Sequence, residues 1–562
     1  MSYSKIFSKN NSIFFLALLA STFSAQAGTI VGTEKEGSDL RVVYVKNTSA
    51  KFDTRYSEDS VVLSKRRAVI AEESKASDTE FTETWYRDGA MPSRISVSAS
   101  RLTIMNAAEL LQPADDINWS QSEVKTLVRQ GPDENRIKLT ILGDGYTLAE
   151  KDRFFEDAQR IADDLFTGDT FASYLPLFNV YAVFVPSQES GITDLRNKNT
   201  AFGLYRSPKG SKRGIMPGNS SAIERALSMA PARADYPIII ANDNFYGGLG
   251  GRYAITTRSV ESGTMVLRHE LGHNFGNVGE EYDGGQVYSG ANHSGRESLP
   301  WNHWIDGSKE IHEGNFITGA YVWKSLNGGK ETVRFNIPEQ QISGQRLFVR
   351  ISSVGWSNPN EIKVKLDGVD AEITGLYTAD RSFFDLKPNA TIAPGAHTLE
   401  IQDVSGDGDN VLAFAQVFSM PLDYDFTADK VGGFLTYNSS GRSVGYRPTE
   451  DSCLMRNMRL KKFCSVDQEN MWHQFFNRVE LIDGVQQKGN QVELAAPNLN
   501  SLEIKWFKST GQGWSALTQY DNLRSISRPE LDAGKYRVDV KFRSPEIRKW
   551  DSKFEDSKEF SI

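Results

Sequence analysis

The chain has 562 residues, with 64 Lys and Arg against 72 Asp and Glu, and a formal net charge of −8. This length exceeds what one hydrophobic core usually organises, so a single small module is excluded and roughly three or four domains are expected. Apolar residues at 39% and aromatic residues at 11% exclude a disordered or collagen-like chain. The acidic balance offers no basic footprint for a polyanion, so nucleic acid is not an expected partner.

Residues 1–27 have the form of a secretory signal peptide. Lys5 and Lys9 precede an apolar run from Ile13 to Ala20, and Ala25-Gln26-Ala27 supplies the small-residue cleavage pattern. The apolar run is too short to cross a bilayer, which needs about 20 residues. We therefore expect a secreted protein, periplasmic or extracellular, that is cleaved near Ala27 and has no membrane span.

The next part of the chain changes from β-type to mixed patterning. Short alternating stretches such as Leu40 to Val45 predict an N-terminal β-rich domain over 28–125. Beyond it, the apolar spacing predicts a strand at 137–141, a helix at 148–166, and strands at 178–185 and 237–241. A strand, helix and strand in this order are typical of an α/β domain.

In two further regions, apolar residues again occur at every second position. Alternating apolar residues between 313 and 419 predict a β-sandwich domain, and the same pattern over 484–562 predicts a C-terminal Ig-like β domain. A helical stretch around Met471 and Phe475 lies between them.

The clearest chemical signal is His269-Glu270-Leu271-Gly272-His273, an HExxH motif on a predicted helix that Thr264 is placed to cap. The i, i+4 spacing brings both imidazoles within reach of one tetrahedral metal ion. Glu270 is then placed to act as a general base on water instead of binding the metal. Gly276 is predicted to adopt a positive φ and end the helix, so that the chain turns back across the metal.

A catalytic zinc ion takes three protein ligands and keeps one position for water, so a third ligand is expected nearby. The long metzincin pattern has a His ten residues after the first His, but this chain has Gly279 there. Glu280, the next residue, is the predicted ligand, with Glu281 and Asp283 as alternatives. A solvated acidic loop is the other interpretation of these acids.

The sequence HELGHNFGNVGEEYD from His269 to Asp283 resembles the IgA-peptidase family of bacterial zinc metallopeptidases. Further blocks resemble that family in the same order: LGDGYTLAEKDRFFEDAQRIADDLF, FNVYAVFVPSQESG, NFYGGLGG, WNHW and YRPTEDSCLMR. The resemblance implies a zinc endopeptidase of metzincin-like architecture, with the acid at 280 as third ligand. It also implies that Met455 belongs to the turn beneath the metal.

The resemblance extends across both sides of the predicted β-sandwich. The zinc peptidase domain is therefore expected over 135–312 plus 420–482, with 313–419 inserted into it. The predicted fold class is α+β and multidomain, a metzincin-like α/β peptidase domain with flanking and inserted β-sandwich domains. The inserted domain is interpreted as a spacer or as a surface that binds glycan or protein.

The two cysteines, Cys453 and Cys464, lie eleven positions apart in a chain expected to leave the reducing cytosol, which predicts a disulfide. A metal role is not expected for them, because neither has a partner at Cys-x-x-Cys spacing. A weaker signal for Ca²⁺ is the loop that holds Asp403, Ser405, Asp407 and Asp409, although an EF-hand would require Glu where Phe414 stands.

These patterns together predict a secreted zinc endopeptidase that acts on extracellular proteins or glycoproteins, with immunoglobulin as one candidate substrate. The reaction would use one Zn²⁺ held by His269, His273 and Glu280. Tyr282, Tyr446 and Arg456 are candidate donors to the oxyanion. The Gly-flanked segment 244–253 is predicted to pair with an extended peptide. The alternative hypothesis is a non-catalytic protein that binds glycan or protein and keeps a vestigial metal site.

Overall fold

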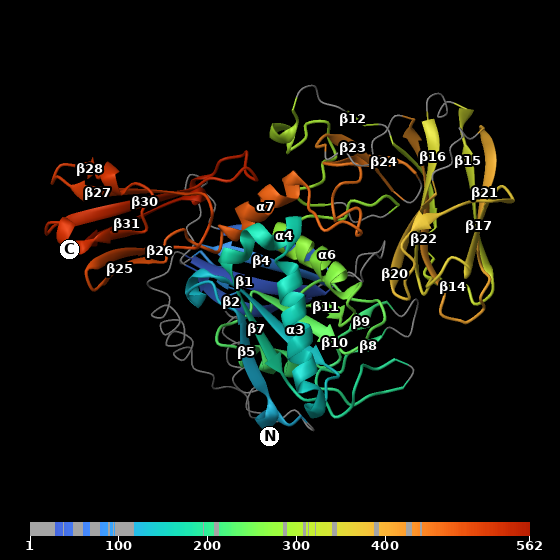
Figure 1. The fold of residues 1–562 in the computed structure, drawn as a ribbon, viewed down its shortest axis with the longest axis horizontal. Helices are drawn as coiled ribbons and strands as arrows, with labels where there is room; N and C mark the ends of the chain where they lie inside the picture. The colour runs from blue at the N-terminus through green and yellow to red at the C-terminus, as the bar shows by residue number, and fades with distance from the viewer. Residues whose placement is uncertain are drawn as a thin grey trace, which may run out of the picture.

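The computed structural model describes residues 28–36, 39–48, 60–67, 79–87, 90–93, 95, 117–194, 196–206, 213–284, 289–306, 311–312, 314–320, 322–339, 345–386, 393–422, 430–438 and 441–562. The predicted signal peptide, residues 1–27, lies outside the described residues. The predicted α+β organisation is confirmed at the level of a mixed, mostly β chain with several sandwich-like units (Figure 1).

The N-terminal strands form one antiparallel sheet in the order β2-β1-β4-β3. Its strands are β1 Gly28–Glu36, β2 Asp39–Thr48, β3 Ser60–Arg67 and β4 Thr79–Tyr86. Glu83 of β4 is fully buried and pairs with Arg478 at 2.5 Å. The sheet is therefore joined to the central part of the protein by a buried ion pair.

A five-stranded sheet of order β11-β10-β6-β7-β5 forms the centre of the molecule, parallel except for the antiparallel edge strand β5. Its strands are β5 Glu123–Val128, β6 Ile137–Asp144, β7 Phe178–Phe184, β10 Tyr236–Ala241 and β11 Ala254–Thr257. Every residue of β6, β7 and β10 is buried, as expected for a parallel sheet covered on both faces. A two-stranded sheet, β8 Tyr205–Arg206 and β9 Ile215–Met216, lies beside it.

Alternate residues of the central strands pack into different cores. Ile238 and Ile240 belong to the core that contains α3, α6 and α7, whereas Ile239 packs with α5. The helices are α3 Lys151–Leu165, α4 Gly168–Phe171, α5 Ser220–Ser228, α6 Gly263–Gly276 and α7 Ser465–Phe475. The helix expected at 148–166 is observed as α3 preceded by a 3-10 turn over 148–150.

The segment between β12 and β23 contains two facing sheets, of order β13-β22-β16-β20-β19 and β15-β21-β17-β18, around one apolar core. Their strands are β13 Asn315–Ala320, β14 Lys324–Ser325, β15 Lys330–Ile337, β16 Gln345–Val354, β17 Ile362–Leu366, β18 Val369–Asp370, β19 Thr374–Gly375, β20 Arg381–Leu386, β21 Gly395–Asp403 and β22 Val411–Pro421. A small sheet contains β12 Ile311–His312, β23 Gly433–Tyr437 and β24 Ser443–Arg447. Strands β12 and β23 stand on either side of the insertion in the sequence and pair with each other, so the two ends of the insertion lie side by side.

The C-terminal strands form two more sheets, β25-β26-β29 and β28-β27-β30-β31, at the opposite end of the molecule from the inserted sandwich (Figure 1). They are β25 Gly484–Lys488, β26 Gln491–Ala495, β27 Leu502–Ser509, β28 Trp514–Ala516, β29 Ser525–Ser527, β30 Lys535–Phe542 and β31 Glu555–Ser561. Trp472 of α7 contacts Phe542 of β30 with ring centroids 4.7 Å apart, which packs these sheets against the central domain.

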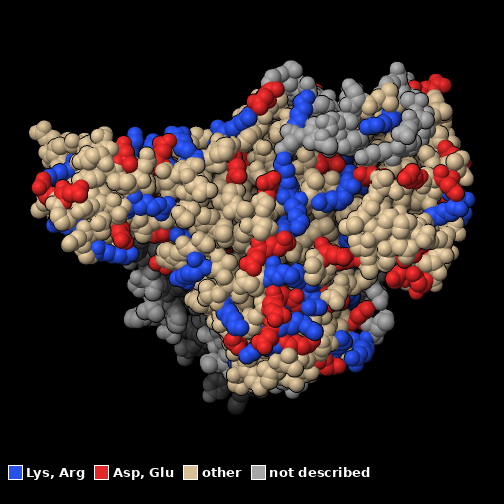
Figure 2. Space-filling model, viewed as in Figure 1, with Lys and Arg blue, Asp and Glu red and all other residues tan. Residues whose placement is uncertain are grey.

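The described surface matches the sequence composition. On the face shown in Figure 2, acidic and basic side chains are interspersed over the described residues without a large patch of one sign. Among the described helices, none combines the length and apolarity needed to cross a bilayer.

Candidate metal centre

Helix α6 carries the HExxH motif through the core of the central domain. Val266, Leu267, Leu271 and Phe275 are at most 1% exposed and hold the helix in place by apolar contact. The residue before the helix is Ser262, not the expected Thr264, which lies inside the first turn. The Ser262 hydroxyl donates to Asp380 Oδ2 at 2.8 Å, so the start of α6 is held by a carboxylate from the inserted sandwich.

The end of α6 differs from the prediction in one residue. Gly276 closes the helix without a positive φ, and Asn277 takes the left-handed conformation at φ 51°. Asn tolerates this conformation better than most residues, which is why glycine is not required there. The turn brings the Val278 carbonyl to 2.8 Å from His273 Nδ1. A proton on Nδ1 then leaves His273 Nε2 with a free lone pair, the arrangement that metal-bound histidines use.

Three side chains that can bind a metal meet in front of this helix. Glu280 Oε2 lies 3.0 Å from His269 Nε2, and Glu280 Oε1 lies 3.2 Å from His273 Nε2. The two Nε2 atoms are 3.2 Å apart. Ligands about 2.0–2.1 Å from a tetrahedral zinc ion are about 3.3–3.4 Å from each other, so these side chains fit such an ion with almost no movement.

The contacts also fit a metal better than a set of hydrogen bonds. Glu280 Oε2 is buried, and although it is close to His269, it has no aligned hydrogen-bond donor among the described residues. His269 and Glu280 are 0% and 4% exposed. Buried polar atoms with converging lone pairs and no donor are expected where a cation binds.

The charges of the three side chains depend strongly on each other. Burial disfavours the charged imidazole, but the carboxylate of Glu280 outweighs it and raises the pKa of His273 to about 9. The same balance raises the pKa of His269. Burial also opposes ionisation of Glu280, yet the two imidazoles hold the pKa of its carboxyl far below the ordinary value. Glu280 is therefore an anion at neutral pH, and a divalent cation would replace the protons on the two Nε2 atoms.

The two alternative acids point elsewhere. Asp283 is enclosed by two arginines, with Arg447 Nη1 at 3.1 Å from Oδ1 and Arg456 Nη1 at 2.9 Å from Oδ2. Glu281 Oε1 accepts a hydrogen bond from Asn292 Nδ2 at 2.9 Å. Only Glu280, of the three acids considered, has its carboxylate beside both histidines.

Met455 lies beneath the motif helix. A Cβ atom on Gly272 would lie 2.9 Å from Met455 Sδ and 2.7 Å from Phe463 Cε1, so the helix and the methionine turn are in close contact between the two histidines. The Glu281 N–H donates to the Met455 carbonyl at 3.2 Å, which also connects this turn to the loop of the third ligand.

The predicted disulfide between Cys453 and Cys464 is not formed in the structure. Both cysteines are free thiols and fully buried. Cys453 Sγ donates to Asp467 Oδ2 at 3.1 Å and accepts from the Cys464 N–H at 3.3 Å, so the thiol is used in hydrogen bonds instead of a bridge.

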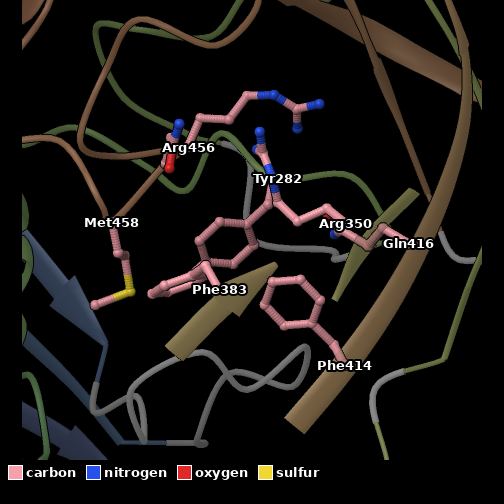
Figure 3. A pocket seen from close by; sticks show the side chains of 8 residues that line it. Tyr282, Arg350, Phe383, Phe414, Gln416, Arg456 and Met458 are labelled. Atoms are coloured by element: carbon pink, nitrogen blue, oxygen red, sulfur yellow. The ribbon is translucent and has the colours of Figure 1, made fainter. Parts of the chain in front are cut away.

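A pocket opens beside Tyr282, whose hydroxyl lies 3.5 Å from His269 Nε2. In Figure 3, the rings of Tyr282, Phe383 and Phe414 lie close together, with Met458 at one side. Phe383 belongs to β20 and Phe414 to β22, so the inserted sandwich supplies one wall of a pocket next to the metal centre. This contribution was missed from the sequence, because nothing in the local pattern shows which sandwich face meets Tyr282.

Of the other two candidate oxyanion donors, Arg456 has structural side-chain contacts, and Tyr446 is held through its backbone. Arg456 is bound to Asp283, and it also donates from Nη1 to the Glu281 carbonyl at 3.2 Å. The backbone of Tyr446 pairs with Ser294 in both directions, at 3.0 and 2.8 Å. Tyr282 is the candidate that lies beside the metal ligands.

The segment 244–253 is not the expected strand. It is a loop whose backbone is paired within the protein: the Gly248 N–H donates to the Arg213 carbonyl at 2.9 Å, and the Leu249 N–H donates to the Ile255 carbonyl at 3.0 Å. These two donors are not available to an added peptide strand, and pairing of a peptide with the rest of the segment stays a prediction.

The acidic loop proposed for Ca²⁺ is closed by its own hydrogen bonds. Asp403 Oδ1 accepts from the Ser405 N–H at 2.9 Å and from the Ser405 hydroxyl at 2.8 Å, while Oδ2 accepts from the Gly328 N–H at 2.6 Å. These contacts are a structural use of Asp403, and Ca²⁺ binding by Asp407 and Asp409 stays a prediction.

Comparison with known proteins identifies the central region. The family model described as IgA Peptidase M64 matches residues 126–313 and confirms the resemblance carried by the motifs. No curated protein matches the sequence.

Solved structures share only weak similarity with the chain. A β-D-glucuronidase from Dictyoglomus thermophilum is 8% identical with a TM-score of 0.14, over 46% of this chain and 44% of that one. The CBM51-2 and INT domains of ZmpB from Clostridium perfringens are 9% identical with a TM-score of 0.12, over 43% of this chain and 78% of that one. The chain thus spans less than half the length of the glucuronidase.

Proposed function

From the membership of residues 126–313 in the IgA peptidase M64 family, we propose that the chain is a secreted zinc endopeptidase that hydrolyses peptide bonds of extracellular proteins. The observation that carries the proposal is the meeting of His269, His273 and Glu280 at 3.0–3.2 Å. The proposal includes a metzincin-like architecture, which the position of Met455 under α6 supports.

The proposed division of roles is supported by the positions of the two histidines and Glu280 and by the HExxH motif. His269, His273 and Glu280 would hold the zinc ion, which supplies Lewis-acid activation of water and of the scissile carbonyl. Glu270 follows His269 on the same helix and is 3% exposed. It accepts the proton of the attacking water and delivers it to the leaving amine, as a general base and then a general acid. Tyr282 is placed to donate its hydroxyl proton to the developing oxyanion.

The wall beside Tyr282 is proposed to face the substrate as it approaches the metal centre. Phe383 and Phe414 are 8% and 9% exposed and give the pocket aromatic walls. The rest of the lining includes Arg350, Gln416, Arg456 and Asn457, so the wall is both aromatic and polar. The inserted sandwich then contributes to specificity directly, while a glycan contact through it stays a prediction.

The test is Glu270→Gln in the full chain, compared with the wild type in a digest of denatured protein substrates. We expect zinc binding to be kept and kcat/KM to fall by about 10²- to 10⁴-fold, because the base is lost while the ligands remain. Glu261→Gln is the matched control: this exposed glutamate precedes the same helix and bonds only outside the metal centre, to Thr378 at 2.6 Å.

Equal cleavage by Glu270→Gln and wild type would contradict the mechanism. A zinc-loaded wild type that cleaves no protein but binds a surface glycan or protein would instead favour the alternative, a non-catalytic binding protein. Secretion with cleavage near Ala27 is part of the proposal and rests on the charged and apolar pattern of residues 1–27.

A further inference from the structure

A second group of side chains with metal-binding chemistry includes Glu281, the neighbour of Glu280 in the chain. Glu281, Cys453, Cys464 and Asp467 are each 0% exposed. One ligand atom of each lies within 4.8 Å of the ligand atoms of the other three. They come from three separate segments: the loop after α6, the turn that contains Met455, and the start of α7.

Two oxygens of this group lack partners. Glu281 Oε2 and Asp467 Oδ1 are buried and have no hydrogen-bond partner among the described residues. The other oxygen of each carboxylate is bonded, to Asn292 and to Cys453 respectively. Leaving a buried carboxylate oxygen without a donor is costly, so a ligand that offers positive charge is expected between them.

The residue types select the ion. Two sulfur ligands disfavour Mg²⁺ and Ca²⁺, which prefer oxygen, and two thiolates with two carboxylates suit zinc. Ligands at zinc–sulfur and zinc–oxygen distances lie about 3.3–3.8 Å apart in a tetrahedron, so a small contraction of the observed group is enough. Cys464 and Asp467 have the x₂ spacing of a zinc knuckle, with a carboxylate in place of the second thiol.

We propose that Glu281, Cys453, Cys464 and Asp467 bind a second zinc ion with a structural role. Binding displaces a proton from each thiol and ties three segments together. Glu281 directly follows Glu280, and Cys453 lies two residues before Met455, so the ion fixes both the third-ligand loop and the methionine turn. This role could not be read from the sequence, because neither cysteine has a Cys-x-x-Cys partner and Glu281 comes from a distant segment.

The first test removes the other metal site. In the full chain with His269→Ala and His273→Ala, we expect one zinc ion per chain to remain after gel filtration. Replacement by Co²⁺ should give a thiolate-to-cobalt charge-transfer absorption. Adding Cys453→Ser and Cys464→Ser to the same chain should abolish both the bound metal and the absorption. These readouts do not depend on peptidase activity, so failure here and failure of the proposed function are distinguishable.

The second test adds a ligand instead of removing one. Asp467→Cys creates a Cys-x-x-Cys pair and should lower the dissociation constant of the second zinc ion by about tenfold or more, since thiolate binds zinc more strongly than carboxylate. An unchanged constant would overturn the proposal. So would a chain without His269 and His273 that holds no metal, or whose two cysteines resist alkylation after denaturation with a chelator because they form a disulfide.

Discussion

Gly272→Ala tests the contact between the motif helix and the methionine turn. The new Cβ would lie 2.7 Å from Phe463 Cε1 and 2.9 Å from Met455 Sδ, closer than real Cβ contacts allow. Both partners are fully buried, so neither can move into solvent. Overpacking of this kind costs about 1–3 kcal/mol, and the better helix propensity of Ala offsets about 1 kcal/mol of it.

The expected net loss is about 0–2 kcal/mol, which lowers Tm of the zinc-loaded protein by up to about 6 °C. Displacement of Met455 should also weaken zinc binding, because the helix shifts between its two ligands. The measurements are calorimetry and a competitive zinc titration. Gly276→Ala is the control in the same helix, since its Cβ would lie 3.2 Å from a Val278 methyl and 3.5 Å from Met471 Cγ, with no contact under 3.0 Å. If Gly272→Ala raised Tm as an ordinary helix substitution does, the close contact with Met455 would be refuted.

Three further predictions concern the surroundings of the metal centre. Burial lowers the pKa of His473 to about 4. Because this folded-state pKa is depressed, the stability that the neutral imidazole contributes is present above about pH 6.5, and about 3 kcal/mol of it is lost as the pH falls towards 4. His473→Gln should remove this part of the pH dependence of unfolding in urea. Asp283→Asn leaves Arg447 and Arg456 buried with Glu450 as a remaining carboxylate partner, so unfolding in urea should require about 1–3 kcal/mol less, and an unchanged stability would contradict the ion-pair assignment. Asp380→Ala removes the acceptor at the start of α6 and should cost about 1–3 kcal/mol, measured by the same unfolding assay against Asp370→Ala on the exposed strand β18.

Much of the central domain could be predicted because its signals are local. The apolar run from Ile137 and the spacing of Phe154 and Phe155 reflect burial of one strand on both faces and of one helix on one face. The same holds for the HExxH motif, since i, i+4 residues on a helix are neighbours whatever surrounds them. These features therefore need no knowledge of the tertiary fold.

Features that join distant segments could not be read in this way. The thiols were expected to pair with each other, yet Cys453 donates to Asp467, and Glu281 approaches from a loop that precedes them by more than a hundred positions. The wall of the pocket beside Tyr282 comes from Phe383 and Phe414, because the inserted sandwich folds back on the central domain. No periodicity reports such contacts.

The sequence by itself determined that His269 and His273 lie one helical turn apart with Glu270 beside them and three acids soon after, because helix geometry fixes the first relation from spacing alone. Only the tertiary structure decided that Glu280, and neither Glu281 nor Asp283, faces the histidines. The left-handed turn at Asn277 sets the direction of the loop, and buried arginines and Asn292 bind the other two acids. Three adjacent carboxylates with the same chemistry thus receive three different roles from the partners that the fold brings to each of them.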